Sequence, residues 1–117
     1  MSLFVIPQHK RFAVRHNVQL RSVRGHALAA LLIEISLRGC RVSVFGHELL
    51  EVDQPVTMEI NGYGNFDGRI SSASDKILAI RFLRSIQGAT LHALVWSPAE
   101  ESQPILQLPA FGVLSQT

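Results

Sequence analysis

The sequence is poor in several residue types, and each shortage excludes a class of protein. Cys40 is the single cysteine among 117 residues, which excludes a disulfide within the chain and a zinc site built from several cysteines. The longest apolar run, Ala27 to Ile33, is too short to span a membrane, and the segment before Lys10 is too short for a signal-peptide core. We therefore expect a soluble, cytoplasmic protein that does not insert into a membrane.

Patterns typical of catalysis are also missing. No base or orienting group accompanies Cys40, the one thiol that could act as a nucleophile, and Cys40 is better interpreted as a small core residue. The five histidines do not have the spacing of metal ligands, and we interpret them as ordinary surface or boundary residues: His9, His16, His26, His47 and His92. We predict that the protein is not an enzyme and has neither a metal nor a cofactor.

Charge is distributed unevenly along the chain. Residues 1–41 contain seven basic side chains and one acidic one, Glu34, a net charge of +6, whereas the remaining residues contain four basic and eight acidic side chains, a net charge of −4. This asymmetry favours an anionic partner at one end of the fold, whether a nucleotide, a nucleic acid or an acidic protein. Non-specific nucleic-acid binding is the less favoured of these, because the few aromatic residues mostly occupy predicted core positions.

The apolar residues predict six short strands. Alternation over 17–24, a dense apolar run over 27–35, and renewed alternation over 40–45, 56–60, 66–70 and 76–82 are each typical of strands. Short turns separate them, among them 36–39, the glycine-rich 61–65 and 71–75, while the polar connection 46–53 allows one helical turn. Short connections make neighbours antiparallel, and six such strands with one buried face close most economically into a small barrel.

The period changes after the sixth strand. Apolar residues over 85–96 fall near helical spacing, with Ser85 as a predicted N-cap and Ser97-Pro98 as the stop, although Gly88 weakens this helix. We thus predict an all-β fold with a C-terminal helix. Its parts are an N-terminal tail (1–9), one domain (10–96) and a proline-containing tail (97–117), which is either disordered or packed on the barrel or a partner.

Two short motifs indicate where a ligand binds. Arg11 and Arg15 are four residues apart in a basic arm, a spacing that places two guanidinium groups on one side of the chain, where they can grip phosphate and stack on aromatic rings. The turn from Glu34 to Gly39 places the Ser36 hydroxyl beside main-chain N–H groups, a concave donor surface suited to a phosphate or a base edge.

Together these motifs resemble the PilZ domain family, whose members combine an Arg-x-x-x-Arg arm with an Asp/Asn-x-Ser-x-x-Gly turn about twenty residues later. The arm here is Arg11-Phe12-Ala13-Val14-Arg15, and the turn is Glu34-Ile35-Ser36-Leu37-Arg38-Gly39. The resemblance covers roughly residues 10–95 and includes the closing strand Leu78-Ala79-Ile80-Arg81-Phe82. It implies a six-stranded antiparallel barrel followed by a helix, as a stand-alone, single-domain member of the family.

The resemblance also implies a ligand, the bacterial second messenger cyclic di-GMP, with two phosphates and two guanines. Arg11 and Arg15 would grip phosphate and stack on guanine, Ser36 would hydrogen-bond the ligand, and Gly39 would keep the turn tight. Lys10 adds a cation that in some members accompanies a stacked pair of ligand molecules, so one or two ligands per protomer are open. Arg15→Ala is then expected to cost about 2 to 4 kcal/mol of binding free energy.

One position departs from the family pattern. Glu34 stands where members have Asp or Asn, which keeps a carboxylate acceptor for a guanine N–H but moves it one methylene outward, at a cost of around 1 kcal/mol. Two functions follow. The first is a cyclic di-GMP receptor or adaptor whose arm becomes ordered on ligand binding, changing the surface shown to an unidentified protein partner. The alternative is a PilZ-like interaction module that does not bind the nucleotide because of Glu34.

Overall fold

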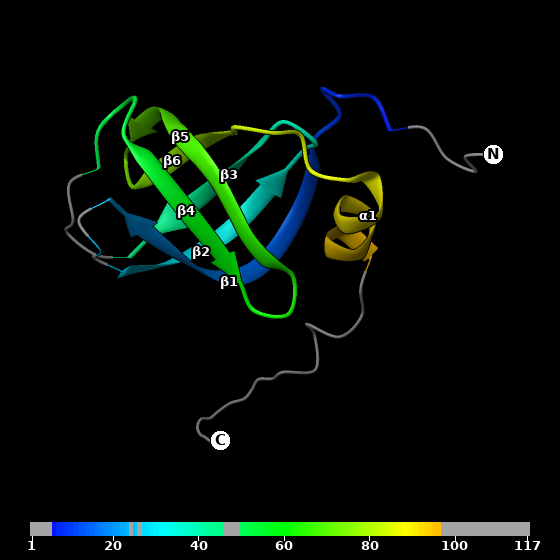
Figure 1. Cartoon of the computed structure of the whole chain (residues 1–117), viewed down its shortest axis with the longest axis horizontal. Coiled ribbons are helices and arrows are strands. Elements are labelled where there is room, and N and C mark those ends of the chain that lie inside the picture. The colour runs from blue at the N-terminus through cyan, green and yellow to red at the C-terminus, as the bar shows by residue number, and fades with distance from the viewer. Residues whose placement is uncertain (1–5, 24, 26, 46–49, 97–117) are drawn as a thin grey trace, which may run out of the picture.

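The computed structural model describes residues 6–23, 25, 27–45 and 50–96 (Figure 1). Within these residues the chain forms six strands and then one helix: β1 (Phe12–Ser22), β2 (Ala27–Ile35), β3 (Gly39–Val44), β4 (Pro55–Ile60), β5 (Gly64–Ser74), β6 (Ile77–Phe82) and α1 (Gly88–Trp96). The all-β fold with a C-terminal helix is therefore confirmed. The described part of the chain contains no helix that is long and apolar enough to cross a membrane.

The six strands close into one antiparallel barrel in the order β1-β2-β3-β6-β5-β4. Sequence neighbours pair with each other except β3 and β4, and the long-range pairings of β1 with β4 and of β3 with β6 complete the circle. Closure satisfies the backbone groups that an open sheet would leave at its edges. The predicted six-stranded antiparallel barrel is thus the observed architecture.

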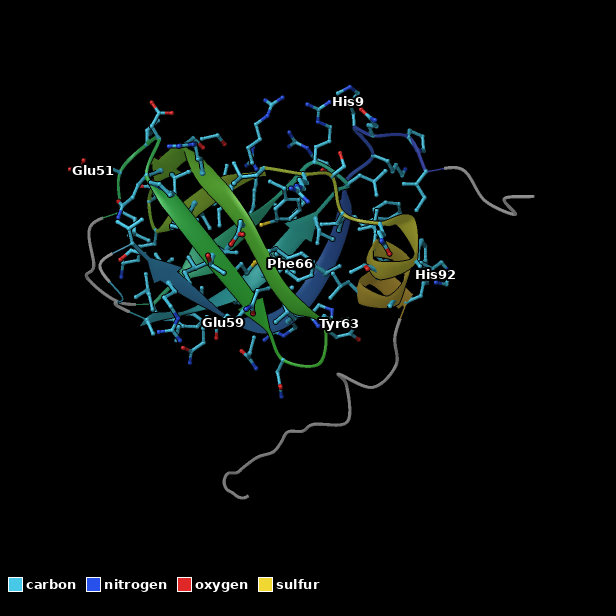
Figure 2. The ribbon with its side chains drawn as sticks, in the orientation of Figure 1. His9, Glu51, Glu59, Tyr63, Phe66 and His92 are labelled. Carbon is cyan, nitrogen blue, oxygen red and sulfur yellow. The ribbon has the colours of Figure 1, made fainter. Side chains whose placement is uncertain are left out.

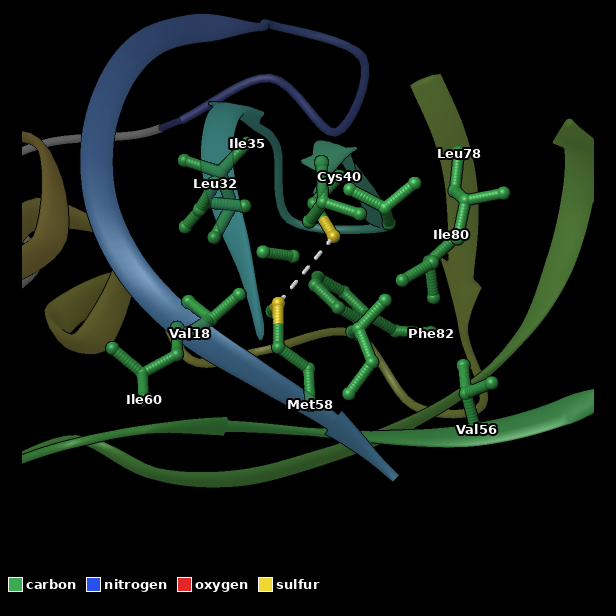
Figure 3. Packing of buried hydrophobic residues seen from close by; sticks show 14 of the residues in the cluster. Val18, Leu32, Ile35, Cys40, Val56, Met58, Ile60, Leu78, Ile80 and Phe82 are labelled. Atoms are coloured by element: carbon green, nitrogen blue, oxygen red, sulfur yellow. Dashed lines mark hydrogen bonds between the residues drawn. The ribbon is translucent and has the colours of Figure 1, made fainter. Parts of the chain in front are cut away.

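Alternating side chains fill the barrel. Inward positions such as Leu20, Leu32 and Met58 are at most 1% exposed, and each fully buried aliphatic side chain contributes about 1.5–3 kcal/mol. Cys40 lies in this core with its Sγ 3.9 Å from Met58 Sδ, among the residues labelled in Figure 3. The interpretation of Cys40 as a small core residue is confirmed.

Strand β1 begins earlier than the sequence predicts. It starts at Phe12 rather than Asn17, because the long β2 offers partners as far as Ile35, which pairs with Phe12. A register shift between Ala13 and His16 accommodates the extension, and Phe12 and Val14 pack against the core. The predicted arm is therefore part of a strand from Phe12 onward.

Two other boundaries differ from the prediction. Strand β5 continues to Ser74, so 71–75 is not a turn; the chain reverses at Asp75 and Lys76, whose φ angles of 50° and 68° are left-handed. Helix α1 begins at Gly88 rather than at Ser85, with Leu91 N donating to Gln87 O. Glycine costs little there, because the first turn lacks intrahelical N–H bonds. The helical turn suggested within 46–53 falls partly outside the described residues.

Helix α1 packs beside the first half of β1 (Figure 1), burying Leu91 and Leu94. His16, expected at the surface or boundary, is 7% exposed, and its Nε2 lies 2.7 Å from Leu94 O. That distance is a hydrogen bond in which the imidazole N–H donates to the carbonyl. In Figure 2, His92 lies on α1 and Tyr63 lies in the turn between β4 and β5. The Tyr63 ring contacts the His16 ring edge-on. The residues beyond Trp96, including the predicted stop and tail, lie outside the described part.

Candidate functional site

A cleft of about 350 Å³ lies where the N-terminal segment passes the turn between β2 and β3. One wall comes from the N-terminal segment, a second from the turn and adjoining strand ends, and a third from the outer faces of β5 and β6. The residues that define these walls are Gln8, His9 and Arg11; Glu34, Ser36, Arg38, Gly39 and Arg41; and Ser71, Ser72, Ala79 and Arg81. In Figure 2, His9 marks this end of the barrel. Four of the six predicted site residues thus meet in one cavity.

The carboxylate of Glu34 holds two of the cleft's arginines. Its Oε1 lies 3.4 Å from Arg11 Nη1 and 3.5 Å from Arg41 Nε. Arg41 is the cross-strand partner of Glu34, after a register shift in β2 between Leu32 and Glu34. The cleft also contains Arg38 and Arg81, so its guanidinium charge exceeds its one carboxylate. An anion that entered the cleft would be attracted to this excess positive charge.

Ser36 fixes the turn. Its Oγ accepts hydrogen bonds from Arg38 N and Gly39 N, both at 3.2 Å, and Ser36 N donates to Gly39 O at 2.8 Å. The main-chain N–H groups of Arg38 and Gly39, which the sequence predicts as donors to a ligand, therefore already donate within the turn. Donors for a ligand come instead from the guanidinium groups around the cleft.

Gly39 is required by the neighbouring strand. A Cβ built at this position would overlap the carbonyl oxygen of Ile80 in β6. The turn is tied to the end of β6 and to the chain after it by two further bonds, from Phe82 N to Arg38 O (2.8 Å) and from Ile86 N to Leu37 O (2.9 Å). The predicted need for glycine has a cause that sequence spacing does not show, namely the close approach of β3 and β6.

Two predicted site residues lie outside the lining of the cleft. Lys10 is exposed, with Nζ 5.8 Å from the centroid of the Phe12 ring, a cation–π contact. Arg15 is exposed on β1, within the register shift between Ala13 and His16. Neither residue lines the cleft in this structure, and their assignment to a ligand remains a prediction.

The cleft contains three arginines that the sequence analysis did not assign to a site. Arg41 could have been found, because strand alternation places it outward, next to the turn. Arg38 donates from Nη1 to Gln8 Oε1 at 3.1 Å, which ties the N-terminal segment to the turn. Arg81 reaches the cleft through the pairing of β6 with β3, where it lies opposite Gly39. No local sequence signal shows that long-range pairing.

The cleft does not activate its one thiol. Burial raises the pKa of Cys40 far above that of a free cysteine, so the thiol stays protonated at neutral pH and is a poor nucleophile. Among the residues that the structure describes, no cluster of three or more His, Cys, Asp or Glu side chains could hold a metal ion. What the cleft's side chains offer is hydrogen-bond donation and positive charge.

Comparison with known proteins identifies the fold. Neither a protein-family profile nor a curated protein matches the sequence. The structure resembles the PilZ domain of CeSA from a cellulose-synthesizing bacterium (17% identity, 74% of this chain and 94% of that one, TM-score 0.58). It also resembles the PilZ domain of YcgR from Escherichia coli, solved with c-di-GMP (15% identity, 82% and 93%, TM-score 0.56). Barrel, strand order and C-terminal helix together show that this chain has the fold of a PilZ domain.

Proposed function

We propose that this protein is a non-catalytic receptor for cyclic di-GMP and that the ligand binds in the arginine-lined cleft. The observation that carries the proposal is the meeting of Arg11, Glu34, Ser36 and Gly39 in one cavity. The likeness to the YcgR domain, which was solved with c-di-GMP, supports the choice of ligand.

The chemistry of the cleft suits such a ligand. Guanidinium groups bind phosphate through parallel hydrogen bonds and stack on the faces of aromatic rings. Cyclic di-GMP has two phosphates and two guanines, so it offers both kinds of partner. The cleft supplies four arginines and only one carboxylate, and its floor includes the small residues Gly39 and Ala79, which leave room for a flat ring.

In this proposal each predicted residue has a role. Ligand groups replace the Glu34 carboxylate at both Arg11 and Arg41, which breaks the two ion pairs. Ser36 and Gly39 hold the turn in the shape that lines the cleft. Arg15 joins the ligand when the arm hinges at the register shift between Ala13 and His16, where the ladder is already interrupted.

Movement of the arm would change a second surface. Phe12 packs edge-on against Trp96 at the end of α1, with ring centroids 5.4 Å apart, and Lys10 lies over Phe12. Displacing the arm would separate these groups and alter the exposed end of α1. We propose that an unidentified partner protein recognises this change, which makes the protein an adaptor. Lys10, when displaced, would be available for a second, stacked ligand molecule.

Calorimetric titration with cyclic di-GMP, with GTP and cyclic AMP as controls, tests the proposal. We expect binding of cyclic di-GMP alone, at micromolar concentration or below, and the titration also gives the number of ligands per protomer. Absence of heat, together with an unchanged melting temperature in the presence of the ligand, would contradict the receptor function.

The alternative is a partner-binding module that does not bind the nucleotide. Glu34 favours it, since its carboxylate already occupies Arg11 and Arg41 in the cleft. These pairs are partly exposed, with 60% and 48% of the two arginine side chains accessible, and exposed pairs contribute only about 0–1 kcal/mol. A dianionic ligand can therefore replace the carboxylate, and we prefer the receptor function.

A further inference from the structure

The wall of the cleft formed by β3 and β6 is a regular array on the outer face of the barrel. In the β3–β6 ladder, Gly39 lies opposite Arg81, and Arg41 lies opposite Ala79. Directly paired residues share a face, with Cβ atoms about 5 Å apart. Each arginine of this wall therefore adjoins a residue with little or no side chain, which leaves a shallow floor between two guanidinium groups.

A β-bulge extends that floor into β5. The register of β5 against β6 shifts between Ile70 and Ser72, after which Ser72 pairs with Ala79. Ser71 and Ser72 are both exposed, both line the cleft, and Ser71 Oγ donates to Ala79 O at 3.3 Å. Bulges redirect side chains and are frequent beside functional sites. Here the bulge places two hydroxyl groups in the cavity that Arg81 also lines.

Arg81 is placed where an anion would relieve an unfavourable contact. It lies directly opposite Arg69 in the β5–β6 ladder, and like charges in that relation destabilise a sheet. Arg69 donates from Nη1 to Asp53 O at 2.8 Å and does not line the cleft. Among the described residues the Arg81 side chain has no ion pair or hydrogen bond, and it does line the cleft. Its position thus gives no stabilising contact in the free protein and favours a bound anion.

We infer that Arg81, Arg41, Ser71 and Ser72 form a second subsite, which binds the second phosphate and the adjoining guanine of the cyclic di-GMP molecule held by Arg11. This inference rests on the proposed function. Arg11 and Arg81 line the same cavity, and the ligand repeats the same phosphate and purine groups twice. The phosphate binds the Arg81 guanidinium and the Ser72 hydroxyl, and the guanine lies on the floor beside Arg41. The Ser71 hydroxyl donates to Ala79 O, so its oxygen is left as an acceptor for a guanine N–H.

Titration of the full chain with cyclic di-GMP tests the subsite, using Arg81→Gln, Arg81→Lys and the matched control Arg69→Gln. Arg81→Gln is expected to weaken binding about tenfold or more through loss of charged hydrogen bonds, without lowering the melting temperature, because it removes a like-charge pair. Arg81→Lys keeps the charge but not the planar fork, and it is expected to recover part of the affinity. Arg69→Gln also removes the like-charge pair but is expected to change affinity about twofold at most.

The outcomes separate the subsite from the proposed function. The subsite is overturned if wild type binds the ligand and Arg81→Gln has an affinity within twofold of wild type, or an affinity no lower than that of Arg69→Gln. The receptor function is then unaffected. No binding by wild type overturns both. Weakened binding in Arg81→Gln alone, with partial recovery in Arg81→Lys, supports the second subsite.

Discussion

Two of the hollows on the outer surface of the barrel differ in size and in chemistry, and the smaller of these two is the candidate site. The arginine-lined cleft has a volume of about 350 Å³, whereas a groove over β1, β2 and β4 has about 760 Å³. Within the described residues that line the groove, the polar side chains are mostly amides, such as Asn17 and Gln19, and the charged one is Glu59, paired with Arg21 at 3.0 Å. The comparison shows that charge and donor geometry identify the candidate site, while volume does not.

The two hollows also differ in backbone regularity. Beside the groove, β1 pairs with β4 from Val18–Ile60 to Ser22–Val56 without a shift. Three strands that form the cleft or its arm are shifted in register, between Ala13 and His16, between Leu32 and Glu34, and between Ile70 and Ser72. Bulges bend a strand and re-aim its side chains. The irregular end of the barrel is thus the end at which side chains are brought together.

The largest expected difference between the hollows is in ligand binding. Arg11→Ala should weaken cyclic di-GMP binding by about 3 kcal/mol, because it removes a charged, hydrogen-bonded contact to phosphate. Gln19→Ala, in the groove, is the matched control and should leave the affinity unchanged. Calorimetric titration of both variants checks this. If Arg11→Ala binds as tightly as wild type, or if only Gln19→Ala loses affinity, the ligand binds outside the cleft.

Two glycines, one in each hollow, provide a comparison of stability. Gly39→Ala forces a methyl group against the Ile80 carbonyl and should destabilise the fold by about 2–3 kcal/mol. Gly62, in the groove, has a φ of 88° and open space around its Cβ position, so Gly62→Ala should cost only about 1–2 kcal/mol. Chemical denaturation measures both values. A smaller cost at Gly39 than at Gly62 would show that β3 and β6 can separate locally.

Arg15 tests whether the arm moves. The structure places it on β1, outside the lining of the cleft, so a static arm predicts no effect of Arg15→Ala on binding. Our proposal has the arm hinge toward the ligand, and we expect a loss of about 2 kcal/mol. Titration of Arg15→Ala next to Arg11→Ala distinguishes the two. Affinity equal to wild type would mean that the arm remains in β1 when the ligand binds.

The difference between the hollows also shows how far the sequence could be interpreted. Strand alternation predicts the barrel because it is a local feature. The resemblance of two short motifs to those of PilZ domains predicts one side of the cleft, with Arg11, Glu34, Ser36 and Gly39. Arg81 enters the site through the pairing of β3 with β6, and Ser71 enters it through a bulge in β5, where the sequence predicts a turn. His16 is buried by a helix 78 residues further along the chain. All three positions depend on the register between segments that are far apart in the sequence. The periodicity of a single segment carries no information about that register.

Glu34 provides the smallest and most discriminating test of the cleft. If its carboxylate competes with phosphate for Arg11 and Arg41, Glu34→Gln should strengthen cyclic di-GMP binding by about 0.7 kcal/mol, or roughly threefold, as expected for exposed ion pairs. Glu59→Gln removes the acid of the groove's ion pair with Arg21 and should not change affinity. Titration at low ionic strength gives the clearest difference, since salt screens exposed charges. Weaker binding by Glu34→Gln would instead assign the carboxylate to a guanine N–H, the role that Asp or Asn is expected to have in PilZ domains.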